Sequence, residues 1–145
     1  MKKIIKIIFI SLLLLFLNLL NIVNANEKIK IGLLVPMTGK NKDLGESIIK
    51  AVSLAVKDLN NDLIEIYPKD TATRANQTLK SAFELKQRGV KIIIGPIFHE
   101  SLTYLDELKD LTFLSLTNKT LYLPENVISA GINSTSQFNT IKKFL

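Results

Sequence analysis

The sequence predicts an α/β fold, with helices covering a doubly wound parallel sheet. Short apolar runs rich in β-branched residues recur along the chain, and each ends at a proline, a glycine or a polar turn. Segments with apolar residues at helical spacing separate these runs. Such an alternation of strands and helices favours parallel strands joined by right-handed crossovers.

The first 25 residues have the pattern of a secretory signal peptide. Lys2, Lys3 and Lys6 form a positive start, residues 7–20 are almost entirely apolar, and small or apolar residues lead up to Ala25. We therefore expect cleavage after Ala25 and a mature domain over residues 26–145. An uncleaved membrane anchor is the alternative, because the apolar run approaches the ~18 residues that a span requires.

Composition narrows the classes of partner. The formal net charge is +6, and it falls to about +3 once the three signal lysines are removed. The remaining basic residues are scattered and do not alternate with aromatic residues, so a nucleic-acid surface is not expected. The chain has no cysteine, which excludes disulfides, thiol catalysis, cysteine-based zinc sites and a lipid-modified N-terminal cysteine.

The first strand and helix of the mature chain follow directly. Residues Ile29 to Val35 predict a strand that ends at Pro36, because proline lacks the amide that a central strand uses. A helix capped by Asp43 and Glu46 should then run to about Asn60. The stripe expected to be buried against the sheet comprises Leu44, Ile48, Val52, Ala55 and Leu59.

A second strand and helix come next. Residues Leu63 to Tyr67 predict a strand closed by Pro68, with Asp70 and Thr71 at its carboxyl end. A helix over 73–88 should follow, with Gly89 just beyond its end. Its inward-facing residues are expected to be Ala75, Leu79, Ala82, Phe83 and Leu85.

The central strand is predicted at Ile92–Ile94, buried on both faces and stopped by Gly95-Pro96. This places residues 96–101 at the carboxyl edge of the sheet, where ligands of open α/β sheets bind.

Three further elements complete the prediction. Leu102, Leu105 and Leu108 indicate a short helix, and residues 112–116 and 127–132 indicate two more strands. An S-x-x-Q capping box at 134–137 should open a last helix, which contains Phe138, Ile141, Phe144 and Leu145.

Candidate site residues follow the strand ends. The hydroxyls of Ser101 and Thr117, with free amides at helix starts, suit the carboxylate of an amino acid or a peptide-like group, and Asn118 would add an amide contact. Thr38 lies in a turn expected to line the edge of the cleft. The alternative role of Ser101 is to cap the short helix after it.

His99 is the single histidine of the chain. A general base needs a nucleophile and an orienting partner, and a metal site needs three or four ligands; no second histidine and no cysteine is present to supply them. We therefore expect His99 to lie in the cleft or on the surface, and the protein to be no enzyme and to use no cofactor or metal.

Several of these segments together resemble a known family. They are Ile31–Gly39 (IGLLVPMTG), Gly45, Asp70-Thr71, Arg88-Gly89 and Ile92–Phe98 (IIIGPIF) followed by Ser101. In this order they resemble the N-terminal lobe of type I periplasmic binding proteins, in the branch of the leucine/isoleucine/valine-binding proteins. The resemblance implies a ligand held between two hinged lobes, with serine or threonine contacts in the loops of Ser101 and Thr117. It also implies that residues 26–145 form the N-terminal lobe and end just after the first hinge crossing.

The details favour one branch. Residues 68–71 (PKDT), the GPIF-x-x-S segment and residues 115–118 (SLTN) look like the binding-protein-like domain of penicillin-binding protein activators. This resemblance implies a non-catalytic periplasmic regulator whose partner is a peptidoglycan synthase. Membrane contact is expected only through the signal peptide, because the chain has no cysteine for a lipid. The alternative is the solute-binding component of an ABC transporter, whose partners are a permease and an amino-acid-like ligand.

Overall fold

The computed structural model describes residues 4, 6, 9, 11 and 27–144. Apart from those four positions, the predicted signal peptide lies outside the described residues. Among the residues that the structure describes, no helix is long and apolar enough to cross a membrane.

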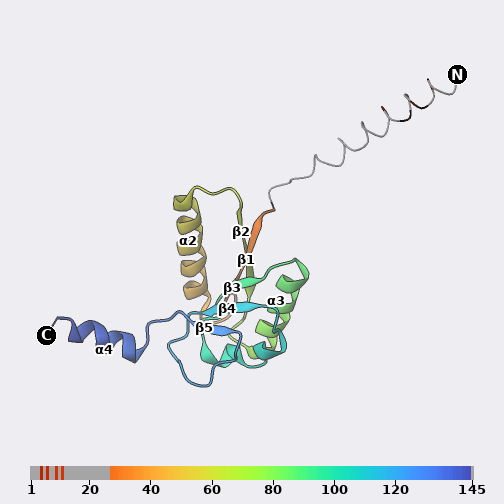
Figure 1. Ribbon diagram of the computed structural model, residues 1–145. Helices are drawn as coiled ribbons and strands as arrows, with labels where there is room; N and C mark the ends of the chain where they lie inside the picture. The colour runs from red at the N-terminus through yellow and green to blue at the C-terminus, as the bar shows by residue number, and fades with distance from the viewer. Residues whose placement is uncertain (1–3, 5, 7–8, 10, 12–26, 145) are drawn as a thin grey trace.

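Five parallel strands form one sheet in the order β2-β1-β3-β4-β5, which confirms the predicted fold class. The strands are β1 (Ile29–Val35), β2 (Ile64–Asp70), β3 (Ile92–Ile94), β4 (Thr112–Ser115) and β5 (Val127–Ser129). The helices are α2 (Lys42–Leu59), α3 (Ala75–Gln87) and α4 (Ser134–Lys142), with the 3-10 turns η1 (His99–Leu102) and η2 (Leu105–Glu107) between β3 and β4. Figure 1 shows α2 and α3 on opposite sides of the sheet, and α4 projecting away from it.

The closed core lies on the α3 face of the sheet. Gly32 marks this face, because a Cβ on it would lie 2.7 Å from Leu85 of α3 and 2.9 Å from Ile93. Strand register places Ile93 and Phe113 on the same face, and both are fully buried. The three leucines predicted to form a helix complete this core: Leu102, Leu105 and Leu108 are all buried. Leu102 and Leu105 lie in two separate 3-10 turns and Leu108 directly follows the second, because Tyr104 adopts a left-handed conformation (φ 72°) that interrupts a single helix.

The α2 face is only partly covered. Ile92 is 43% exposed and Ile128 is 55% exposed, so the expectation that β3 is buried on both faces is wrong at Ile92. The stripe predicted for α2 is also wrong in part, because Leu44, Ala55 and Leu59 are exposed. The helix lies over β1 and β2 with Gly45 buried, and a Cβ there would clash with the carbonyl of Pro36 at 1.8 Å. This close approach leaves Leu44, which directly precedes Gly45, at the side of the helix.

Element ends show further differences. The predicted Asp43–Glu46 cap is not formed; Asn41 precedes α2 and its side chain makes no capping bond. In α3, Phe83 is 48% exposed rather than inward-facing, whereas Gly89 has the predicted left-handed backbone (φ 80°). The last helix begins with a capping box, formed by Asn133 and Ser136 instead of residues 134 and 137. Strands β4 and β5 each end before the predicted limit.

Pro68 lies inside β2 and does not close it. The amide of Thr71 donates to the carbonyl of Val35 in β1, at 3.0 Å. Because alternate residues of a strand face opposite neighbours, the nitrogen of Pro68 points to the outer side of β2, where no strand pairs. A proline is tolerated at such an edge position.

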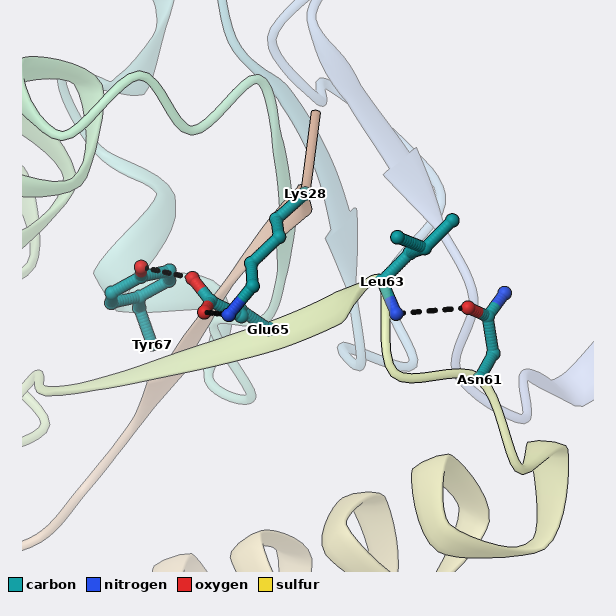
Figure 2. Close-up of polar contacts among 5 residues, drawn as sticks. All are labelled: Lys28, Asn61, Leu63, Glu65 and Tyr67. Atoms are coloured by element: carbon teal, nitrogen blue, oxygen red, sulfur yellow. Dashed lines mark hydrogen bonds and ion pairs between the residues drawn. The ribbon is translucent and has the colours of Figure 1, made fainter. Parts of the chain in front are cut away.

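Polar contacts join β1 and β2 near their amino ends. Figure 2 shows Glu65 between Lys28, with which it forms an ion pair, and Tyr67, whose hydroxyl donates to it at 2.6 Å. The bond from Lys28, and then that from Tyr67, hold the pKa of Glu65 below its usual value. The Asn61 side chain accepts from the amide of Leu63 at 2.9 Å and shapes the turn into β2.

Candidate functional site

The carboxyl ends of β1 and β3 form the natural place for a ligand. These two strands are neighbours, yet the connection after β1 runs over the α2 face and the connection into β3 runs over the α3 face. Such a switch point leaves a crevice at the carboxyl edge of an open α/β sheet. Residues 36–41 border it on one side, and Ile97 and Phe98, both half-buried, follow β3 on the other.

Asp70 fixes the β1 side of this edge. Its Oδ1 accepts from the amides of Met37 (2.7 Å) and Ala72 (2.8 Å), and its Oδ2 accepts from the hydroxyl of Thr38 (2.6 Å). Partial burial raises the pKa of Asp70, but the hydrogen bonds from Thr38, Met37 and Ala72 outweigh it and hold the pKa below its usual value. A single carboxylate thus ties the loop after β1 to the end of β2.

Serine hydroxyls fix the β3 side. The Ser115 hydroxyl donates to the carbonyl of Pro96 at 2.8 Å and accepts from the amide of Thr117 at 3.3 Å. The Ser129 hydroxyl donates to the carbonyl of Thr117 at 3.1 Å. These bonds hold the ends of β3, β4 and β5 in one block.

Two glycines allow neighbouring backbone segments at this edge of the sheet to approach one another closely. A Cβ at Gly95, which has φ 100°, would lie 2.2 Å from the carbonyl oxygen of Leu34. A Cβ at Gly131 would lie 2.2 Å from the carbonyl oxygen of Thr117. Only glycine fits at either position.

The predicted site residues lie on three loops of the same edge. Thr38 and Asn118 are exposed, and His99 is half-buried. Ser101 and Thr117 are buried, at 0% and 2% exposure. The Thr117 hydroxyl accepts from the amide of Lys119 within its own turn, at 3.3 Å.

Ser101 does not cap a helix, contrary to the alternative role considered for it. Residue Phe98 occupies the position before η1, and no side chain caps the turn. The Ser101 hydroxyl and the Nδ1 of His99 are both buried without a hydrogen-bond partner. Two polar atoms of the Pro96–Ser101 loop are therefore unsatisfied.

A shallow cavity of about 360 Å³ lies beside this loop, and His99, Tyr104 and Tyr122 are among its lining residues. Tyr122 is 98% exposed, its neighbour Leu121 is 71% exposed, and Tyr104 is 48% exposed. We call Tyr104, Leu121 and Tyr122 the aromatic rim. No pattern in the sequence marks these residues as part of a site, because isolated aromatic residues in a loop carry no periodic signal. Over residues 27–144 no group of three or more histidine, aspartate or glutamate side chains is placed to hold a metal ion.

Comparison with known proteins agrees with this architecture. A family model for the periplasmic binding proteins matches residues 28–137. No curated protein sequence matches the chain.

Solved structures of two kinds are similar. One is a solute-binding protein of an ABC transporter from Rhodopseudomonas palustris BisB5 in complex with 3,4-dihydroxybenzoic acid (26% identity, TM-score 0.58, covering 63% of this chain and 27% of that one). Another is full-length LpoA from Haemophilus influenzae (26% identity, TM-score 0.54, covering 65% and 17%). The C-domain of the same LpoA, a regulator of PBP1A, matches at 20% identity with a TM-score of 0.61 and covers 80% of this chain and 38% of that one.

The chain thus spans well under half the length of each of these structures. The matched segment includes all five strands and both sides of the crevice. By this match and by its fold, the chain belongs to the periplasmic binding protein family.

Proposed function

We propose that this chain is a non-catalytic binding domain of the cell envelope that regulates peptidoglycan synthesis through protein contact, in the manner of a penicillin-binding protein activator. The observation that carries this proposal is the aromatic rim. Tyr104, Leu121 and Tyr122 present large apolar surface to solvent beside a shallow cavity, whereas the hydroxyls of Ser101 and Thr117 are buried. Exposed tyrosines next to a pocket are typical of protein interfaces, where they act as anchors.

The likeness to LpoA supports the same proposal. At 26% identity it extends to a protein whose C-domain is a regulator of PBP1A. The partner proposed here is accordingly a peptidoglycan synthase of the penicillin-binding protein class, reached in the periplasm after cleavage of the signal peptide.

A binding measurement with matched variants tests this proposal. The mature protein is immobilised, and a purified penicillin-binding protein from the same cell is passed over it. Tyr122→Ala combined with Leu121→Ala should weaken binding at least about tenfold, since each anchor contributes on the order of 1–2 kcal/mol. Leu54→Ala, at an apolar residue of α2 that is 60% exposed, should leave binding unchanged. Equal binding by all three proteins, or none by the unmodified one, would contradict the proposal.

A second candidate is a solute-binding function for an ABC transporter. The crevice between β1 and β3, and the likeness to a protein that binds 3,4-dihydroxybenzoic acid, favour it. An amino-acid-like ligand or an aromatic acid would lie between Thr38, His99 and Asn118, and its carboxylate would reach Ser101 and Thr117 once η1 and the loop after β4 shift. Thermal unfolding with L-leucine and with 3,4-dihydroxybenzoate should then show a midpoint that rises with ligand concentration. The rise should disappear in a Ser101→Ala/Thr117→Ala variant.

A further inference from the structure

The hydroxyl of Thr38 has a fixed role in its hydrogen bond with Asp70. An ionised carboxylate only accepts hydrogen bonds, so Thr38 must donate its proton to Oδ2 of Asp70 across the 2.6 Å contact. The Thr38 hydroxyl therefore cannot donate to a ligand. Because Thr38 is exposed, the lone pairs of its oxygen can still accept a hydrogen bond from solvent or from a ligand.

The charge behind this hydroxyl has no cationic partner. The ion pairs formed within residues 27–144 join Lys28 to Glu65, Lys42 to Glu46, Lys69 to Glu84 and Lys86 to Asp110. Lys40 and Arg74 are close to Asp70 in the sequence, but neither forms an ion pair with it. The donors that hold the carboxylate are uncharged: they are backbone amides, including those of Met37 and Ala72, and the hydroxyl of Thr38.

The corner next to Thr38 is open. A Cβ built on Gly39 would meet no heavy atom within 4 Å. The corner lies at the carboxyl end of β1, where the strand order places the crevice. A ligand group can thus approach Thr38 along the same edge as the other loops.

From these contacts we infer that Thr38, polarised by Asp70, forms a binding position for an ammonium group. A hydroxyl that donates to a carboxylate becomes a stronger acceptor, because hydrogen bonds in a chain polarise one another. The uncompensated negative charge attracts a cation and repels a carboxylate. The carboxylate end of a zwitterionic ligand would consequently lie away from β1, towards the loops after β3 and β4.

Two sources could supply the ammonium group: the α-amino group of a small solute, or a lysine side chain of a protein partner. The inference does not rest on either proposed function. It concerns the chemistry that this corner accepts, and it is tested without a known partner.

The test uses the mature protein labelled with ¹⁵N, and follows the backbone amide signals of Met37, Thr38, Gly39 and Ala72. Three probes are added separately at equal ionic strength: leucinamide for an α-amino group, Nα-acetyl-lysine methylamide for a lysine side chain, and sodium acetate. We expect saturable shifts with one or both ammonium probes, with dissociation constants on the order of 10–100 mM for a single charge-assisted contact. The tighter of the two identifies the source. Saturable shifts with acetate, or none with either ammonium probe, would overturn the inference.

Variants separate the hydroxyl from the rest of the loop. Thr38→Val keeps the branched shape of the side chain but removes the hydroxyl acceptor, and should weaken binding of the ammonium probe at least tenfold. Thr38→Ser keeps a hydroxyl and should bind the probe as the unmodified protein does. Thr103→Val is the control, because the Thr103 hydroxyl donates to the Glu100 carbonyl at 3.1 Å on another exposed loop. Unchanged probe binding by Thr38→Val would also overturn the inference. The Thr38 variants leave the bonds from Met37 and Ala72 to Asp70 in place, so the loop should keep its fold.

Discussion

Ser101 and Ser115 each carry a fully buried hydroxyl, but their surroundings differ. Ser115 donates to Pro96 and accepts from Thr117, whereas the hydroxyl of Ser101 has no partner. A buried polar group without a hydrogen bond lowers the stability of a fold. The serine that the sequence indicated for ligand contact is therefore the one that the fold itself does not use.

Alanine substitutions should separate the two serines. Ser115→Ala leaves the amide of Thr117 without its acceptor, and should lower the free energy of unfolding by about 1–3 kcal/mol. Ser101→Ala removes an unsatisfied group and should leave the free energy of unfolding equal or slightly higher. Urea unfolding of both variants measures the difference. A loss for Ser101→Ala as large as that for Ser115→Ala would show that its hydroxyl has a structural partner.

Asp70 should make stability depend on pH. Its pKa is lowered from the usual 3.8 in the folded state, so its contribution is fully present above that value and is lost as pH falls through the lowered pKa. In Asp70→Asn this contribution is absent, and the difference from the unmodified protein should shrink as the solution is acidified. Denaturant unfolding at neutral and at acidic pH measures it, with Asp62→Asn, on an exposed turn, as the control. A difference that stays constant over this pH range would argue against the Asp70 contacts.

The hydrogen bond between Asp70 and Thr38 could not be predicted from the sequence. Asp70 and Thr71 were recognised at the end of a strand, and Thr38 in a turn, but 32 residues separate the two bonded side chains. Pairing across such a distance depends on strand register, which no local pattern specifies.

At the scale of elements, periodicity predicted which segments are helical better than which side of them is buried. Helix α2 ends within a residue of the prediction, yet Leu44 is exposed because the neighbouring Gly45 sets the line of closest approach to the sheet, and Leu59 is exposed at the last residue of the helix. Between β3 and β4, in contrast, burial was predicted better than the type of helix. There the spacing of the leucines gave their burial correctly and the type of helix wrongly, since a left-handed residue at Tyr104 is not visible in an apolar pattern.

The start of α4 offers a direct test of one element. Asn133→Ala removes a side chain that accepts from the amide of Ser136, and should destabilise this helix by about 1 kcal/mol. Ser134→Ala, at the position predicted from the sequence, should have little effect. Amide hydrogen exchange within α4 reports the local change. Cooperative unfolding of the sheet should not change in either variant, because no residue of α4 is buried; a shift in it would mean that α4 packs against the sheet.

At the scale of the whole molecule, the two faces of the sheet differ. The α3 face holds the closed core, while the α2 face leaves Ile92 43% exposed and Ile128 55% exposed. The sequence predicted the strands but not this asymmetry. Central strands read as uniformly apolar whether or not both of their faces are covered.

A polar substitution on the open face should reveal it. Ile128→Thr should lower the binding of an apolar dye and reduce association at high protein concentration. The free energy of unfolding should change by no more than about 0.5 kcal/mol, since Ile128 is 55% exposed. Dye fluorescence and sedimentation velocity measure these effects, with Lys50→Gln on the exposed side of α2 as the control. A large loss of stability would show that the face is covered in solution.

Pro68 has a consequence for how copies of this molecule can meet. It denies the outer edge of β2 a hydrogen-bond donor halfway along its length, so a strand from another chain cannot pair there along the whole edge. The opposite border, β5, is three residues long and offers too short a template. In the sheet that residues 27–144 form, both borders therefore disfavour edge-to-edge pairing of copies, one through a proline and the other through a short strand.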